Sequence, residues 1–369
     1  MGTATRQKLA GIYDPYIDTL GGGEKYVFTV AQTLLENGYA VDVFTNQDKS
    51  VIEKLQNRFN LNLSKAQIRP DIFKKHGILS ILNKYNITRK YDLFFYLNDG
   101  SVPLIFSKHN ILHVQVPFNK TPNLFQKIIN LIKLSLFKDI IVNSKFTQAR
   151  VKQIYLKNSK LLYPPIDITN FTPAKIKQNI ILSVGRFDNL LNAKRQDILI
   201  KAFKKLYKRN NLPNWQLILA GSSLDKESAN SYLSHLKYIS KDLPVKFVVN
   251  QSFNTIKKLF SISKIYWHAT GFGINEKTNP QSTEHFGMTT VESMAAGLVP
   301  IVINKGGLKE IVGQDIDGFL WEKIDQLVSK TQLLIAHPKK FLHMSQNARN
   351  TSKKYSTQNF KNQFIKIIS

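Results

Sequence analysis

Short apolar runs alternate with amphipathic stretches along the whole sequence, and this alternation restricts the folds that the chain can adopt. A short apolar run bounded by turn residues is typical of a buried strand, and a longer amphipathic stretch is typical of a helix. Strands that are separated by helices pair in parallel, within sheets covered on both faces. The sequence therefore predicts an α/β protein with doubly wound sheets. Strands are expected at residues 9–13, 40–45, 93–97, 110–114, 140–143, 179–184, 216–220, 245–249, 265–269 and 299–303.

A pair of prolines separates the two halves of this pattern. Pro164 and Pro165 follow Tyr163, and adjacent prolines favour the extended backbone of a linker. The chain has 369 residues, which corresponds to two domains of ~100–200 residues each. We expect the first domain to cover residues 1–168 and the second to cover residues 169–354.

The composition excludes several classes of protein. The sequence contains no cysteine, which rules out a disulfide scaffold, cysteine-ligated zinc, iron–sulfur ligation and a thiol nucleophile. No apolar run reaches the ~18 residues of a transmembrane helix, and the first residues lack the apolar region of a signal peptide. These features predict a cytoplasmic protein.

The chain is strongly basic, with 52 Lys and Arg against 25 Asp and Glu and a formal net charge of +27. Residues 1–170 carry +11 and the remainder carries +16, so no single basic tail accounts for the charge. Three interpretations stay open: a lysine-rich composition bias, contact with an anionic membrane surface and binding of nucleic acid. The membrane surface is favoured over nucleic acid, because dispersed charge does not define a nucleic-acid face.

Residues 124–137 form a segment that combines Leu, Ile and Phe with interleaved lysines. The lysines are Lys127, Lys133 and Lys138. One interpretation is a buried or half-buried helix of the core. The other is a basic amphipathic helix that lies on a membrane surface.

Residues 284–300 contain two carboxylates and a short predicted helix, and they form the strongest motif of the chain. Glu284 precedes Gly287, where a loop without a Cβ can approach a ligand closely, and the helix is expected over residues 288–296. Backbone N–H groups at the start of this helix would bind a diphosphate. Glu292 lies inside the helix, where it can accept hydrogen bonds from a ribose, and Glu284 can meet sugar hydroxyls.

Several motifs, in order along the chain, resemble retaining GT-B glycosyltransferases of family 4. Glu284 and Glu292, followed by Met-Ala-Ala-Gly and a proline-bearing strand, carry most of the resemblance. The segment over residues 267–287 is similar to the dolichol-pathway α-1,2-mannosyltransferase branch and its bacterial relatives. Further segments that resemble the family are residues 143–147, 163–167, 183–187, 194–197, 219–222 and 306–312.

The resemblance implies two Rossmann-like doubly wound domains that face each other across a cleft. The N-terminal domain would bind the acceptor and the C-terminal domain the nucleotide sugar, while a last helix over about residues 355–369 would pack back on the first domain. The resemblance also implies a metal-independent hexosyltransferase without a cofactor or metal ligands. It assigns Glu284, Arg186, Lys194 and His113 as catalytic residues and, as donor-binding residues, Gly21, Gly22, Gly23, Gly221, Val249, Phe286, Gly287, Met288, Thr289 and Glu292.

Two of these assignments have a physical reason as well. Arg186 and Lys194 are suited to stabilise the negative charge that develops on a departing diphosphate. The spacing between them is longer here than is common in the family. His113 lies beside an apolar strand, where it resembles by position the family's histidine near the transferred sugar. A structural role for His113 is the alternative.

The family resemblance leads to an expected function. We expect a retaining glycosyltransferase that moves a hexose, with mannose favoured, from a nucleotide-diphosphate sugar to a glycan or polyprenyl-linked glycan acceptor. A GDP-sugar is slightly favoured over a UDP-sugar as the donor. The expected location is cytoplasmic, with peripheral contact to the inner face of an anionic cell membrane as a further hypothesis, and no specific nucleic acid is expected. The alternative is a catalytically degenerate GT-B-like binding protein or a basic nucleic-acid-binding protein.

Overall fold

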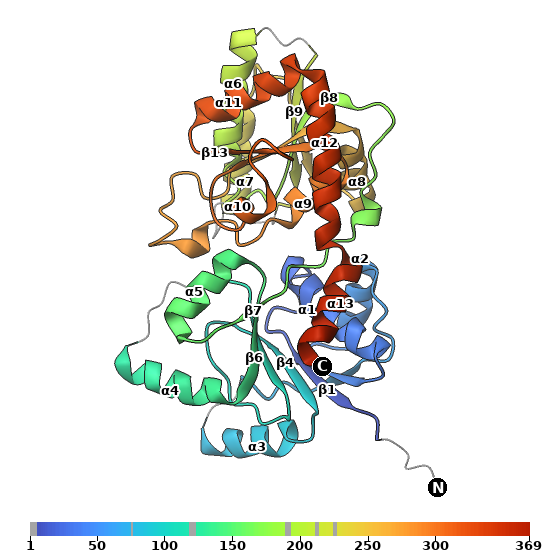
Figure 1. Cartoon of the computed structure of the whole chain (residues 1–369), viewed down its shortest axis with the longest axis vertical. Helices are drawn as coiled ribbons and strands as arrows, with labels where there is room; N and C mark the ends of the chain where they lie inside the picture. The colour runs from blue at the N-terminus through green and yellow to red at the C-terminus, as the bar shows by residue number, and fades with distance from the viewer. Residues whose placement is uncertain (1–5, 75–76, 118–122, 189–192, 211–213, 224–226) are drawn as a thin grey trace. The chain divides into compact units, whose positions relative to one another are not determined.

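The chain folds into two units, each built around a parallel sheet (Figure 1). Unit 1 comprises Met1–Pro165 together with Thr357–Ser369, and unit 2 comprises Ile166–Ser356. The division follows Pro165, close to the predicted boundary after residue 168, and the last helix belongs to unit 1. The computed structural model describes residues 6–74, 77–117, 123–188, 193–210, 214–223 and 227–369.

The sheet of unit 1 has seven parallel strands in the order β3-β2-β1-β4-β5-β6-β7. The direction of strand addition reverses between β1 and β4, as in a doubly wound sheet. Every residue of β4 is buried, because both faces of the sheet are covered. The elements are β1 Leu9–Tyr13, α1 Gly22–Glu36, β2 Ala40–Phe44, α2 Ser50–Phe59, β3 Gln67–Arg69, α3 Ile78–Thr88, β4 Leu93–Leu97, β5 Asn110–Val114, α4 Leu124–Ser135, β6 Phe137–Val142, α5 Lys145–Tyr155, β7 Lys160–Leu161 and α13 Thr357–Ile368.

The sheet of unit 2 has six parallel strands in the order β10-β9-β8-β11-β12-β13. Here the reversal falls between β8 and β11, and the central strand β12 is buried at every residue. The elements are η1 Ile168–Asn170, β8 Gln178–Val184, α6 Gln196–Asn210, β9 Gln216–Gly221, α7 Glu227–Ile239, β10 Val245–Val249, α8 Phe253–Ile262, β11 Ser263–His268, η2 Pro280–Ser282, α9 Met288–Ala295, β12 Val299–Ile303, α10 Leu308–Ile311, β13 Phe319–Trp321, α11 Ile324–Ala336, α12 Pro338–Ser352 and η3 Lys353–Tyr355.

All ten predicted strands overlap observed strands, which confirms the two doubly wound sheets. The sequence analysis missed the short strands β3, β7 and β13, because two or three residues do not make a recognisable apolar run. It also extended one helix too far. Helix α4 ends at Ser135, and Phe137 already begins strand β6.

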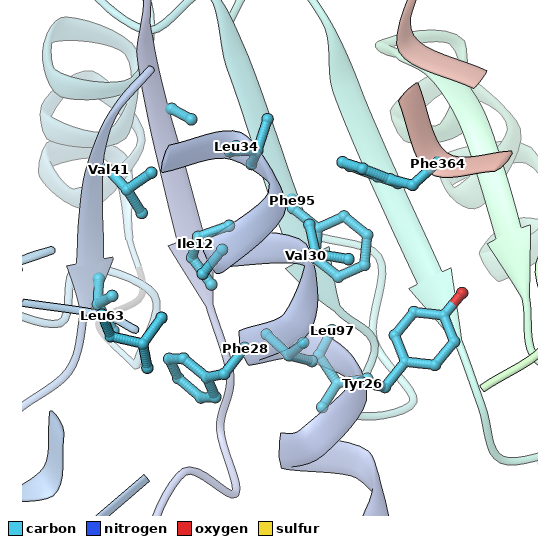
Figure 2. Packing of buried hydrophobic residues seen from close by; sticks show 14 of the residues in the cluster. Ile12, Tyr26, Phe28, Val30, Leu34, Val41, Leu63, Phe95, Leu97 and Phe364 are labelled. Carbon is cyan, nitrogen blue, oxygen red and sulfur yellow. The ribbon is translucent and has the colours of Figure 1, made fainter. Parts of the chain in front are cut away.

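Two hydrophobic clusters of unit 1 lie on opposite faces of its sheet. Phe95 and Leu97 of β4 belong to one cluster, whereas Phe94 and Tyr96 belong to the other, since successive strand residues point to opposite faces. The first cluster also takes in apolar residues of α1, α2 and α13. Figure 2 shows the side chains of α1 packed between β1 and the last helix.

The last helix is anchored in this first cluster by aromatic side chains. Phe360 and Phe364 of α13 are 3% and 0% exposed. The Phe360 ring meets Tyr26 edge-on, with 4.8 Å between the ring centroids. Lys361 adds an ion pair to Glu36 of α1 at 2.7 Å. The C-terminal residues therefore complete the core of unit 1, although they follow unit 2 in the sequence.

Replacing Phe364 with alanine should lower the free energy of unfolding of unit 1 by ~3–5 kcal/mol, because it leaves a cavity in the core. Urea unfolding followed by circular dichroism measures the change. Leu342→Ala is the matched control, since Leu342 of α12 is 65% exposed and should change stability by less than ~0.5 kcal/mol. Equal effects of the two variants would contradict the anchoring role of α13.

Candidate active site

Two of the predicted donor-binding residues of unit 2, Gly221 and Val249, lie at the carboxyl ends of its parallel strands, and the others lie in α9 and the loop before it. Gly221 ends β9, Val249 ends β10 and His268 ends β11, while Gly185 directly follows β8. Because the strands are parallel, these ends share one edge of the sheet. Open α/β sheets bind ligands at this edge, at the point where the strand order reverses. The edge between β8 and β11 is therefore the candidate site of unit 2.

Three titratable side chains meet at this edge. Lys194 Nζ lies 2.7 Å from Glu284 Oε2, and His268 Nε2 lies 3.2 Å from the same oxygen. The Lys194 and Glu284 side chains are 18% and 14% exposed, so water has little access to the ion pair. The structure thus brings together two of the predicted catalytic residues and adds His268, which the sequence analysis had not selected. We call these three side chains the charged cluster.

The charged cluster holds Glu284 ionised. Burial alone would raise the pKa of this carboxyl, but the Lys194 ammonium and the His268 N–H outweigh burial and hold the pKa of Glu284 well below its usual value. Burial lowers the pKa of His268, so the imidazole is neutral at neutral pH. The Thr270 N–H donates to His268 Nδ1 at 3.4 Å, which leaves the proton on Nε2. His268 is therefore a neutral donor to a fixed carboxylate.

Glycines position the backbone of Glu284. The Gly307 N–H donates to the Glu284 carbonyl at 2.8 Å, and Gly306 packs on that carbonyl so closely that no Cβ fits. Gly306 and Gly287 have φ angles of +56° and +108°, in the region that favours glycine. The segment 306–312, which carried part of the family resemblance, thus supports the loop that presents the carboxylate.

Polar contacts hold the loop that precedes Glu284. Glu276 accepts a hydrogen bond from the Gly306 N–H at 2.9 Å. Arg195 Nη1 donates to the Phe272 carbonyl at 2.8 Å. Arg195 has a φ of +52°, and this left-handed turn lets two neighbouring cations, Lys194 and Arg195, reach two different partners. These contacts position the charged cluster from outside it.

Helix α9 begins beside the charged cluster. A Cβ built on Gly287, the N-cap of α9, would lie 3.5 Å from Glu284 Cγ. The first N–H groups of a helix lack intrahelical acceptors and carry a partial positive charge. The hydroxyl of Thr289 bonds to the Tyr266 hydroxyl at 2.7 Å and ties this turn to β11. Glu292 is partly exposed on the next turn. The helix start therefore offers an anion-binding group next to a carboxylate.

The other predicted residues of unit 2 have different surroundings. The Arg186 side chain is 51% exposed and pairs with Asp188 at 3.4 Å. Residues 189–192, which separate it from Lys194, lie outside the described residues. Phe286 is 3% exposed, and its ring packs against Tyr355 with 5.4 Å between centroids. Phe286 therefore supports the loop through its buried side chain.

Unit 1 carries a second group of predicted residues at the start of α1. The Gly21 N–H and the Thr19 hydroxyl both donate to Glu24, at 2.5 and 2.7 Å, and this fixes the glycine loop. Gly23 packs so closely against the end of the Gln115 side chain that a Cβ at this position would require Gln115 to move. Gln115 directly follows β5. The sequence analysis did not select Gln115, because no motif marks it, and only the strand order places it beside the glycine loop.

His113 is enclosed in the core of unit 1. Its side chain is fully buried, and its ring stacks on Tyr26 with 4.0 Å between centroids. Its Nδ1 lies 3.2 Å from the Ile141 carbonyl and donates to it. Burial lowers the pKa of His113 to about 3. These surroundings favour the structural role that the sequence analysis kept as the alternative to a catalytic one.

Asp14 is a buried carboxyl that the sequence analysis did not select. It directly follows β1, is 2% exposed and accepts the Tyr16 N–H at 2.8 Å through Oδ1. Its Oδ2 has no hydrogen-bond partner among the described residues. Burial and the nearby Glu24 carboxylate raise the pKa of Asp14 well above its usual value. An aspartate after a strand is common in turns, so the sequence alone carried no signal of this burial.

The described residues show neither a metal site nor a membrane span. Among them, no group of three or more His, Asp or Glu side chains is arranged to hold a metal ion. No helix within the same residues has the length and apolar character needed to cross a bilayer.

Two doubly wound units and the charged cluster at the strand ends of unit 2 are the features of a GT-B glycosyltransferase. Comparisons with protein families agree with this class. The model of Glycosyltransferase Family 4 matches residues 20–170, and the model of Glycosyl transferases group 1 matches residues 167–351. The second match covers half of the chain. The protein belongs to the glycosyl transferases group 1 family, which confirms the family that the motifs had indicated.

Individual relatives include mannosyltransferases. The chain is 29% identical over 263 residues to the GDP-Man:Man(3)GlcNAc(2)-PP-Dol alpha-1,2-mannosyltransferase of Dictyostelium discoideum, which covers 67% of this chain and 50% of that protein. An uncharacterized glycosyltransferase of Haemophilus influenzae is 25% identical and covers 95% of this chain and 97% of that protein. The chain thus spans about half the length of the mannosyltransferase to which it is similar.

Solved structures share the fold at low sequence identity. A glycosyltransferase from Rickettsia africae is 17% identical, with a TM-score of 0.77 over 98% of both chains. Anabaena Alr3699/HepE, in complex with UDP and glucose, is 17% identical, with a TM-score of 0.70 over 98% of this chain and 99% of that chain. These similarities confirm the predicted GT-B fold class.

Replacing His113 with glutamine should weaken the dependence of stability on pH. The pKa of His113 is about 3 in the folded protein and 6.5 when unperturbed, so the unfolded chain binds a proton that the folded chain does not. Stability is therefore lost as the pH falls through 6.5. This group alone should lower the free energy of unfolding by ~2 kcal/mol between pH 7.5 and pH 5, measured by urea unfolding at both pH values.

The comparison must be made between the protein and its variant, because Asp14, with its raised pKa, changes stability in the opposite direction. Glutamine keeps an N–H donor for the Ile141 carbonyl but does not titrate. The exposed His343 of α12 provides the control variant His343→Gln, which should leave the difference between the two pH values unchanged. The same difference in protein and His113→Gln would contradict the neutral, buried state of His113.

Proposed function

We propose that this protein is a retaining glycosyltransferase that transfers a hexose from a nucleotide-diphosphate sugar to a glycan or lipid-linked glycan. The observation that carries the proposal is the charged cluster beside the start of α9. A fixed cation and a helix N-terminus suit a diphosphate, and a fixed carboxylate suits sugar hydroxyls. Membership in the glycosyl transferases group 1 family supports the same class of reaction.

In this proposal, unit 2 stabilises the leaving group. The bond between the sugar and the diphosphate breaks while an acceptor hydroxyl bonds to the same sugar carbon and gives its proton to the departing diphosphate, on which negative charge grows. Lys194 and the first N–H groups of α9 stabilise that charge, and Arg186 adds a second cation. Because surrounding contacts already position Lys194, little reorganisation is needed as the charge develops. The charge is met by protein groups, so the proposal requires neither a metal nor a cofactor.

The two glutamates have separate roles in this proposal. Glu284 is held ionised by Lys194 and His268, so it accepts hydrogen bonds from hydroxyls of the transferred sugar. Glu292 lies one turn into α9 and is partly exposed, so it accepts hydrogen bonds from the ribose of the donor. The carbonyl and N–H groups at the ends of β9 and β10, at Gly221 and Val249, face the remainder of the nucleotide.

We propose a GDP-sugar of the mannose type as the donor, with a UDP-sugar as the alternative. Several relatives of the chain are named as enzymes that use GDP-Man, whereas the structure of Alr3699/HepE contains UDP. Ribose and diphosphate are common to both donors, so Glu292 and α9 do not distinguish them. The choice of base would fall to the segment after β10.

We propose a polyprenyl-linked glycan as the acceptor, reached by a cytoplasmic protein at the surface of an anionic membrane. Relatives of the chain are named for acceptors that carry PP-Dol, and the net charge of +27 favours contact with anionic headgroups. Unit 1 would hold the acceptor, because the donor groups lie in unit 2.

Lys194→Ala should lower turnover by ~100-fold or more, as expected when a preorganised charge stabiliser is lost. Initial rates with a GDP- or UDP-sugar and a polyprenyl-linked glycan measure the effect. Lys264→Ala is the matched control, because Lys264 lies near the opposite end of β11 and bonds to Asn179. Turnover that is unchanged in Lys194→Ala would remove this residue from the proposed reaction.

Glu292→Gln should weaken nucleotide binding by ~tenfold or more, because a hydrogen bond to a charged group contributes about 1.5–3 kcal/mol. A thermal-shift panel with UDP, GDP, ADP and their sugar conjugates, without added metal, first identifies the nucleotide. Calorimetry with that nucleotide then compares Glu292→Gln with Glu322→Gln, an exposed glutamate of the same unit. Equal affinities would reject the ribose role. A folded protein that no nucleotide stabilises would contradict the proposed donor site.

A further inference from the structure

Exposed apolar side chains gather on two helices of unit 1. Of the 17 large hydrophobic residues that are exposed within the described part of the chain, ten belong to α3 and α4. Exposed apolar groups of this number on neighbouring elements mark an interaction site in a folded protein. We call the following ten residues the α3–α4 surface: Ile78, Leu79, Ile81, Leu82, Tyr85, Leu124, Phe125, Ile128, Leu131 and Ile132.

Helix α4 directs its apolar face away from the core. Leu124, Ile128 and Ile132 recur every four residues, so they lie on one side of the helix, and they are 76%, 50% and 65% exposed. Leu134 is its one fully buried residue, and it joins the hydrophobic cluster under the helix. A surface helix in water normally turns its apolar stripe toward the core. The structure therefore places most apolar residues of α4 on its exposed side, which favours a surface helix over a buried one.

Helices α3 and α4 cover the same face of the sheet. Ile87 of α3 packs against the same hydrophobic cluster that contains Leu134. Burial lowers the pKa of Lys84 in α3, and the ammonium of Lys133 in α4 lowers it further, so the two lysines lie near each other. Figure 1 shows both helices at the lower margin of unit 1. Their exposed apolar residues therefore contribute to one side of this unit.

The charged residues of the two sequence stretches that carry the α3–α4 surface are all basic, while Asp71 lies near Lys74 and Lys84, and Asp92 pairs with Lys108. No Asp or Glu occurs in residues 72–91 or in residues 100–138. The described basic residues of these two stretches are Lys74, Lys84, Arg89, Lys90, Lys108, Lys127, Lys133 and Lys138. Apolar side chains that are flanked by lysines match the boundary of an anionic bilayer, where hydrocarbon lies just beneath negative headgroups.

We propose that the α3–α4 surface docks this protein on an anionic lipid bilayer. The apolar side chains enter the boundary between headgroups and acyl chains, and the lysines extend to the lipid phosphates. The inference rests on the proposed function only in that a lipid-linked acceptor would be presented at such a bilayer. A second copy of the chain is disfavoured as the occupant, because it would bring the same lysines against each other. Nucleic acid would pair with the lysines but leave the apolar residues in water.

The test is sedimentation of the whole chain with vesicles of phosphatidylglycerol and phosphatidylcholine in equal amounts. We expect binding that is weaker with vesicles of pure phosphatidylcholine and in ~0.5 M salt. Phe125→Glu/Ile132→Glu in α4 and Leu79→Glu/Leu82→Glu in α3 should each weaken binding by ~tenfold or more. These positions are between 53% and 83% exposed, so the substitutions leave the core intact.

The matched control is Ile176→Glu/Leu342→Glu, which changes two exposed apolar residues of unit 2 and should bind vesicles as the unaltered protein does. Absence of vesicle binding, or equal loss in this control, would overturn the proposal. Analytical ultracentrifugation of the same variants tests whether a second copy of the chain occupies this surface instead. If the unaltered protein self-associates and binds no vesicles, and the α3 and α4 variants lose the self-association, the surface is a protein interface and the bilayer proposal is overturned.

Failure of this inference can be told apart from failure of the proposed function. Each α3 or α4 variant should keep the thermal shift that the unaltered protein shows with its nucleotide, since both helices belong to unit 1. Nucleotide binding and sugar transfer without vesicle binding would overturn the docking surface alone. Vesicle binding in a protein that transfers no sugar would overturn the proposed function and leave the docking surface standing.

Discussion

A carboxylate that is largely withdrawn from water has to be compensated, and the candidate site of unit 2 depends on how Glu284 is compensated. Its two partners come from the two sides of the point where the strand order reverses. Lys194 lies in the connection after β8, and His268 ends β11. Removing one partner of a buried ion pair costs ~3–5 kcal/mol, because the remaining charge stays buried. The ion pair therefore links the elements that flank the switch point, and in the proposed reaction the same fixed charges bind the diphosphate and the sugar.

The backbone around the charged cluster adopts unusual conformations, and the need to hold Glu284 and Lys194 in contact explains them. Gly287 and Gly306 have positive φ angles, and Arg195 has one although it carries a side chain. Glycine adopts such angles without steric cost, whereas for Arg195 the conformation costs free energy and persists where the surroundings over-determine it. Here the Phe272 carbonyl holds Arg195, and the Glu284 backbone holds the glycine segment. In unit 1, burial instead raises the pKa of Asp14 and lowers the pKa of His113, which favours the uncharged form of each group.

Local pattern predicted the strands well, and the site only in part. An apolar run reports burial along one element, so strands such as β4 and β12 were recognisable, whereas the three-residue β13 was not. Motifs selected Glu284 and Lys194. Neither pattern reports which side chains from distant strands meet, and that is why His268 beside Glu284 and Gln115 beside Gly23 were not selected. The same limit applies to His113, since its enclosure by Tyr26 depends on how α1 packs over β5.

Helix α4 shows where periodicity stops being informative, because one apolar stripe serves equally for a core and for a membrane surface. Whether the apolar stripe of α4 faces the core or the solvent depends on which side chains already cover the sheet. Leu134 and Ile87 fill the space above the cluster, so the remaining apolar residues of α3 and α4 face outward. A lysine-rich composition bias explains positive charge in both units, but it does not explain why exposed apolar residues are concentrated on α3 and α4. The described residues of unit 2 include five exposed large hydrophobic side chains, and these are scattered over separate segments. Dispersed exposure of that kind is normal, whereas ten exposed apolar residues on two helices mark an interaction surface, and the proposed bilayer fits both these residues and the lysines beside them.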